Sequence, residues 1–150
     1  MIDEEEIEKN AELFDVPLAT IVKDHAISHA LFCLSQIIGK DAGKKVLFYG
    51  GTALNRTHFT DFRLSEDIDL MIKEYPAWIK IMQPQLLASM RKVFPKAQWK
   101  NEHDGDGIWT LNLECEENVT IQIQCVEPRV RWEIYAQYIS STEVKLRYSD

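Results

Sequence analysis

The spacing of apolar residues along the chain predicts four helices. Leu18 to Ile38 is the clearest, because apolar side chains recur at helical spacing and Gly39 follows as a stop signal. Asp3 is a candidate N-cap for an acidic, mostly solvated first helix. Pro84 lies inside the last helical segment, where a proline removes a backbone hydrogen bond and favours a kink or two helical pieces. The four segments are Met1 to Phe14, Leu18 to Ile38, Thr52 to His58 and Pro76 to Phe94.

Short apolar or alternating segments predict strands between and after these helices. Val46 to Tyr49 is an apolar run typical of a buried strand, and Asp67 to Ile72 predicts a second strand. The second half predicts a meander, with turns at Asp104-Gly105-Asp106-Gly107 and Glu116-Glu117-Asn118. The strands of this meander are Ala97 to His103, Ile108 to Cys115 and Val119 to Val126. We therefore expect an α+β fold, a small mixed sheet flanked by helices.

Composition limits the class of protein. A chain of 150 residues suits one domain, residues 1–150. The net charge of −7 argues against broad, non-specific adhesion to nucleic acid or to an anionic membrane. Three cysteines without a CxxC pair, and no signal peptide, predict reduced thiols in the cytoplasm. No apolar run is long enough to span a bilayer.

Two aspartates in Ser65-Glu66-Asp67-Ile68-Asp69-Leu70 carry the first candidate chemistry. Residues two apart on a strand point to the same face, so Asp67 and Asp69 should project together. Two carboxylates that close repel each other unless a cation lies between them. Mg²⁺ prefers such oxygen ligands and commonly bridges carboxylates to substrate phosphates. Asp67 and Asp69 are therefore candidate metal ligands.

A glycine turn upstream supplies the second half of a candidate site. Gly50 and Gly51 allow the backbone to come close to a ligand. The helix that follows offers free N–H groups and the positive end of its dipole, which suit phosphate, and Thr52 adds a hydroxyl. Taken singly, a Gly-Gly turn is more often only a turn, and an Asp-x-Asp pair is more often a solvated strand edge. Their order and spacing together favour a triphosphate site beside a metal site.

These motifs resemble those of a known family. Gly50-Gly51-Thr52-Ala53-Leu54, with Phe62 to Leu70 downstream, closely resembles the signature of the AbiEii/AbiGii nucleotidyltransferase toxins, within the polymerase-beta-like nucleotidyltransferase superfamily. Val22-Lys23-Asp24-His25 is similar to a helix motif of the same family. The resemblance implies that Gly50, Gly51 and Thr52 contact a nucleoside triphosphate, and that Asp67 and Asp69 bind Mg²⁺ or Mn²⁺. It further implies that Arg63 and Ser65 support the phosphates and that Lys23 and Asp24 approach the site.

Two features depart from the family pattern. The superfamily has a third carboxylate on a later strand, and Gln124 stands at the matching place in Ile121-Gln122-Ile123-Gln124. A glutamine cannot act as a general base, so Glu114 is the candidate substitute and Glu127 a weaker one. Family members also continue into a helical C-terminal region, whereas this chain stops at Asp150. A minimal domain lacking that region is one reading, and an incomplete active site is the other.

The leading hypothesis from the sequence is a Mg²⁺-dependent nucleotidyltransferase. The resemblance implies transfer of NMP from an NTP to a hydroxyl acceptor such as tRNA, by the toxin of a type IV toxin–antitoxin or phage-defence system with a cognate antitoxin. Asp67, Asp69, Glu114 and Lys23 are its candidate catalytic residues. The alternative is a catalytically inactive relative that binds nucleotide or a protein partner. A structural domain with an incidental acidic edge is the third reading.

Overall fold

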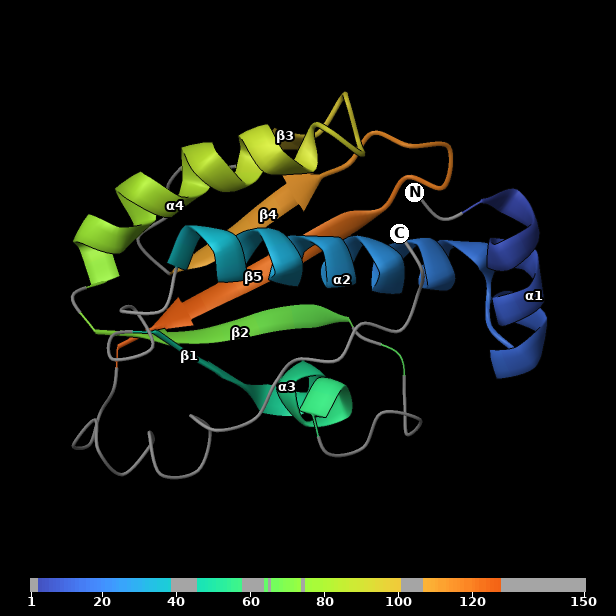
Figure 1. Cartoon of the computed structure of the whole chain (residues 1–150), viewed down its shortest axis with the longest axis horizontal. Coiled ribbons are helices and arrows are strands. Elements are labelled where there is room, and N and C mark those ends of the chain that lie inside the picture. Colours follow the sequence, from blue (N-terminus) through green and yellow to red (C-terminus); the bar gives the residue numbers. More distant parts are fainter. Residues whose placement is uncertain are drawn as a thin grey trace.

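A computed structural model of the chain describes residues 3–38, 46–57, 64, 66–73, 75–100 and 107–127 (Figure 1). The described helices and strands follow one another in an α+β order. They are α1 (Glu4–Phe14), α2 (Leu18–Ile38), β1 (Val46–Tyr49), α3 (Gly50–Thr57), β2 (Asp67–Ile72), α4 (Tyr75–Met90), β3 (Gln98–Trp99), β4 (Ile108–Asn112) and β5 (Thr120–Val126).

The strands form one five-stranded mixed sheet in the order β1-β2-β5-β4-β3. β1 pairs antiparallel with β2, and β3, β4 and β5 form the predicted antiparallel meander. The two groups are joined by β2 and β5, which pair in parallel. This central parallel pair brings the aspartate strand against the last strand of the meander, although more than forty residues separate them in the sequence.

One face of the sheet forms the hydrophobic core. Ile68 and Leu70 of β2 point to this face, together with Ile121 and Ile123 of β5, and all four are buried. α2 and α4 contact each other and pack on this face, whereas α3 contacts β1 and β2 and lies near the β1–β2 edge of the sheet in Figure 1. The strand residues that alternate with the core residues therefore point away from α2 and α4.

Most of the predicted elements are confirmed, several with the predicted ends. α2, β1 and β2 have the boundaries expected from the sequence. The Asp3 carboxylate accepts a hydrogen bond from the Glu6 N–H at 2.8 Å, as an N-cap does. α1 ends at Phe14 and is capped by Asp15, which adopts a left-handed conformation with φ 52°. No helix in these ranges combines the length and apolar character needed to cross a bilayer.

Several predicted elements differ from the structure. β3 covers Gln98–Trp99 rather than Ala97 to His103, of which residues 101–103 lie outside the described residues. α4 is one helix across Pro84, so the predicted division into two helical pieces is wrong. Pro84 is exposed, and the helix is held in the core by Met82, Leu86 and Met90. α3 begins at Gly50 rather than Thr52, so the glycines form its first turn. β4 ends at Asn112 rather than Cys115, because Glu114 has a φ of 47° that a strand cannot continue through. Asp104 to Asp106, in one predicted turn, lie outside the described residues.

Candidate functional site

Asp67 and Asp69 lie on the same side of β2, as the strand period predicts. Both are half-buried, whereas Ile68 between them is fully buried and Leu70 is 2% exposed. Because Ile68 and Leu70 pack into the core, the two carboxylates project from the opposite face of the sheet. Their Cα atoms are about 7 Å apart by the rise of a strand. Two acids at that separation can hold one cation between them or two side by side.

Gly50 stands directly against Asp69. Tyr49, the residue before it, is the register partner of Asp69 in the β1–β2 pair, so the chain enters α3 beside this carboxylate. Gly50 has a φ of 82°, a conformation that L-residues rarely adopt. A Cβ placed on Gly50 would overlap Oδ2 of Asp69 and lie 3.1 Å from its Cγ. The first turn of α3 and the aspartate strand are therefore in immediate contact, which the sequence could not establish.

β5 places glutamines beside both aspartates. In the parallel β2–β5 register, Asp67 is the partner of Gln122 and Asp69 is the partner of Gln124. Both glutamines are exposed, while Ile121 and Ile123 beside them are buried, so the glutamines share the open face with the aspartates. Gln124 thus occupies the position next to Asp69 where the resemblance led us to expect a third acid. Its amide oxygen can ligate a cation, but it brings no negative charge.

Thr52 is more enclosed than expected for a residue that contacts a ligand from solvent. It is fully buried, in the first turn of α3. Its hydroxyl oxygen has no hydrogen-bond partner among the described residues. A buried hydroxyl without a partner is uncommon in folded proteins and calls for an explanation. A phosphate at the start of α3 is one group that could satisfy it.

A buried ion pair that was not predicted from the sequence holds the last turn of α3 against α2. Arg56, in its last turn, is 1% exposed, and Asp24 of α2 is fully buried. Arg56 Nη2 lies 2.9 Å from Asp24 Oδ1 and donates a hydrogen bond to the Asp24 carbonyl oxygen at 3.0 Å. The sequence contained one signal for it: Asp24 stands in the apolar part of a helix, where a buried carboxylate requires a cationic partner.

Glu114 lies away from the two aspartates. It follows β4 beyond Asn112, which pairs with Thr120, whereas Asp69 faces Gln124. Thr120 is four strand steps from Gln124, about 13 Å, and two steps from Gln122, the partner of Asp67. The Glu114 carboxylate accepts a hydrogen bond from the Gln98 side chain of β3. The structure therefore does not bring this candidate third acid to Asp67 and Asp69.

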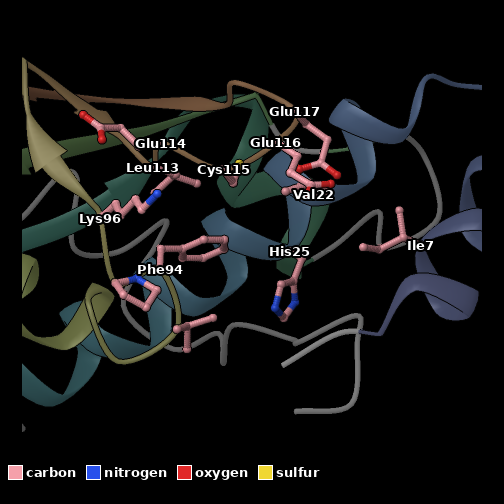
Figure 2. Close-up of a pocket in the computed structure, with 12 residues that line it drawn as sticks. Ile7, Val22, His25, Phe94, Lys96, Leu113, Glu114, Cys115, Glu116 and Glu117 are labelled. Atoms are coloured by element: carbon pink, nitrogen blue, oxygen red, sulfur yellow. The ribbon is translucent and has the colours of Figure 1, made fainter.

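Glu114 instead lines a cavity at the other end of the sheet. This cavity has a volume of about 480 Å³ and lies between α1, α2, the turn after α4 and the β4–β5 turn. Figure 2 shows Ile7, His25, Phe94 and Leu113 around it, with Glu116 and Glu117 at its edge. None of the residues that line it belongs to α3 or β2. It is therefore separate from the aspartate site.

The remaining predicted residues occupy different positions. Lys23 is half-buried on α2, and its neighbour Asp24 contacts Arg56 of α3. Arg63 and Ser65 lie outside the described residues. The structure thus brings together Gly50, the first turn of α3 and the two aspartates, and it does not join Glu114 to them, while the role of Lys23 stays a prediction.

The donor set at β2 suits a hard divalent cation bound jointly by protein and substrate. Asp67 and Asp69 supply carboxylate oxygens, and Gln124 can add an amide oxygen. In the part of the chain that the structure describes, no cluster of three or more His, Cys, Asp and Glu side chains could enclose a metal ion. Mg²⁺ usually keeps several waters and takes further ligands from phosphates, so two carboxylates are a sufficient protein contribution.

The fold is that of a nucleotidyltransferase domain. The structure of MenT4, a nucleotidyltransferase toxin from Mycobacterium tuberculosis, matches it with a TM-score of 0.58 and 12% sequence identity. The match covers 98% of this chain and 55% of that one, so this chain spans about half the length of MenT4. At this identity the likeness shows a shared fold.

The chain belongs to the AbiEii family. The family model described as "Nucleotidyl transferase AbiEii toxin, Type IV TA system" matches residues 33–132, two thirds of the chain. The match includes the glycine turn, both aspartates and the Gln124 strand, and it begins after Asp24. A search among curated proteins finds no match. The family assignment made from Gly50 to Leu70 is thereby confirmed.

Proposed function

We propose that this protein transfers a nucleoside monophosphate from an NTP to a hydroxyl acceptor, with Mg²⁺ or Mn²⁺ as cofactor. The observation that carries the proposal is the contact between Gly50, which opens α3, and Asp69, whose carboxylate shares the open face of β2 with Asp67. A phosphate-binding helix start and a pair of metal-binding acids at one place are what nucleotidyl transfer requires.

The protein's own residues would position the triphosphate. The N–H groups at the start of α3 would donate to phosphate oxygens, and the Thr52 hydroxyl, which has no hydrogen-bond partner among the described residues, would gain one. Asp67 and Asp69 would hold the divalent cation, which neutralises the triphosphate charge when bound. An acceptor hydroxyl oxygen would then bond to the α-phosphorus as the bond to the bridging oxygen breaks, releasing pyrophosphate and passing the hydroxyl proton to water or a carboxylate. Positioning and charge neutralisation would supply most of the rate.

Family membership supports a toxin role. The family description names a type IV toxin–antitoxin system, so an antitoxin encoded with this protein is part of the proposal. A role in phage defence is also proposed, from the family resemblance alone. tRNA is the acceptor that we would test first, because the family resemblance implies it. Other RNAs form the comparison set.

Replacing both aspartates tests the proposal. The double variant Asp67→Ala/Asp69→Ala should keep the fold, because neither side chain belongs to the core, and should lose transfer of labelled NTP to RNA. Glu116→Ala/Glu117→Ala also removes two carboxylates, but from the β4–β5 turn beside the separate cavity, so it is the matched control and should retain transfer. Undiminished transfer by a folded double variant would refute the metal-binding role.

The glutamine beside Asp69 favours a second function, the binding of nucleotide without its transfer. Gln124 adds no third negative charge at the site, which suits a relative that binds nucleotide without transferring it. Calorimetry with each NTP and Mg²⁺, run beside the transfer assay, separates the two functions. Binding without turnover across varied acceptors would favour the non-catalytic reading, and turnover would exclude it.

A further inference from the structure

The buried ion pair of Asp24 and Arg56 ties α3, whose first turn lies against Asp69, to α2. Arg56 places one nitrogen, Nη2, between two oxygens of the same residue, the Oδ1 and the main-chain carbonyl oxygen of Asp24. Such a contact fixes the Arg56 side chain against the backbone of α2 as well as against a side chain. Both residues are almost completely shielded from solvent, so water cannot easily replace either bond.

The position of Arg56 within α3 makes the pair relevant to the glycine turn. Thr52 and Arg56 are four residues apart, so they lie on one face of the helix, and both are buried. α3 is only eight residues long, too short to be stable alone. Its placement therefore depends on its tertiary contacts: Gly50 against Asp69 at the start and Arg56 against Asp24 at the end.

We infer that the Asp24–Arg56 pair positions the first turn of α3 against Asp67 and Asp69, and that NTP affinity depends on it. The inference rests on the proposed function for its ligand. Arg56 and Asp24 are positioning residues, because their bonded atoms are enclosed between α2 and α3 and act through the helix. A shift of about 1 Å in a positioned group is enough to reduce a rate on the order of a hundredfold, so a small displacement of α3 matters.

A pure stability role makes a different prediction from a positioning role. If the pair only stabilised the fold, its loss would lower the melting temperature and leave the NTP affinity of the folded molecules unchanged. If it positions α3, the loss weakens NTP binding at temperatures well below melting. Leu86→Ala is the matched control, because Leu86 is a fully buried residue of α4 in the main hydrophobic core cluster, to which none of the described side chains of α3 belongs.

The experiment compares Arg56→Met, Asp24→Asn and Arg56→Lys with Leu86→Ala in the full chain. Each of the four ribonucleoside triphosphates with Mg²⁺ is titrated by calorimetry below the melting transition. We expect Arg56→Met and Asp24→Asn to weaken binding on the order of tenfold, Arg56→Lys to recover part of it, and Leu86→Ala to leave it unchanged. Equal affinity in the parent, both pair variants and the control would overturn the inference.

Hydrogen exchange separates failure of this inference from failure of the proposed function. The amides of α3, residues 51–57, should exchange faster in Arg56→Met and Asp24→Asn than in Leu86→Ala at matched stability. If the parent binds none of the four triphosphates, the proposed function fails, and the exchange data alone decide whether the pair positions α3. Unchanged α3 exchange in both pair variants would then overturn the inference.

Discussion

Gly50 lies so close to the Asp69 carboxylate that a side chain at position 50 would overlap it, so only glycine fits there. The positive φ of Gly50 and the overlap that a Cβ would make with the Asp69 carboxylate act together. The glycine at the start of α3 thus has a role beyond flexibility, because it lets a charged strand residue lie against the helix start. This contact joins two motifs that are nineteen residues apart in the sequence.

Gly50→Ala should therefore lower stability as well as function. The substituted residue would hold a positive φ and displace Asp69, and strain of this kind amounts to roughly 1–3 kcal/mol. Urea unfolding measures the loss directly. Gly51→Ala is the matched control, because Gly51 lies in the same helix without a positive φ and alanine favours helix. Equal stability of the two variants would contradict the close contact.

Gln124→Glu should make the fold more dependent on a divalent cation. The new carboxylate would stand beside Asp69 across the parallel β2–β5 pair, and like charges there destabilise by roughly 0.2–1 kcal/mol. Mg²⁺ should restore this loss, so the melting temperature should rise more on Mg²⁺ addition than it does in the parent. Gln85→Glu adds the same charge to an exposed position of α4, on the other side of the sheet from the aspartates, and should show no such gain. The same Mg²⁺ response in both variants would argue against a cation site at Asp69.

Glu114→Gln should retain nucleotidyl transfer. Glu114 lies beyond the end of β4, bonded to Gln98 and on the wall of a separate cavity, so it should not serve as the third acid. Asp69→Asn, by comparison, should reduce transfer on the order of a hundredfold or more, since it removes a charge at the reacting phosphates. A loss in Glu114→Gln as large as that in Asp69→Asn would restore Glu114 to the active site.

Buried thiols should make the fold less stable in alkali. Burial raises the pKa of Cys125 far above its ordinary value, and burial also raises the pKa of Cys33. A raised pKa in the folded state means that stability is fully present below the unfolded thiol pKa, near 8.5, and falls as pH rises towards the folded pKa. For Cys125 the fall approaches about 1.4 kcal/mol per pH unit.

Urea unfolding between about pH 7 and pH 10.5 measures how the free energy of unfolding changes with pH. This is roughly the range in which a free thiol ionises. Cys125→Ala should flatten this pH dependence, because the variant has one ionisable buried group fewer. Cys115→Ala leaves both buried thiols in place and should keep the slope of the parent. A slope that is unchanged by Cys125→Ala would show that burial of this thiol is not its cause.

The sequence alone determined the local elements and the face of the aspartates. The apolar spacing of Leu18 to Ile38 and the alternation around Ile68 are local patterns, and local backbone periods decide which side chains share a face. The family followed from the same short stretch, because Gly50 to Leu70 carries both motifs. The roles of Arg63 and Ser65 stay predictions, since both lie outside the described residues.

Only the tertiary structure decided which distant residues meet. The parallel pairing of β2 with β5 sets Gln124 beside Asp69, and the same register leaves Glu114 at the far end of the sheet. Likewise, Asp24 meets Arg56 across thirty-two residues, a partnership that no local period encodes. Strand register and buried charge pairing depend on how the whole core packs, because each buries groups that are remote along the chain.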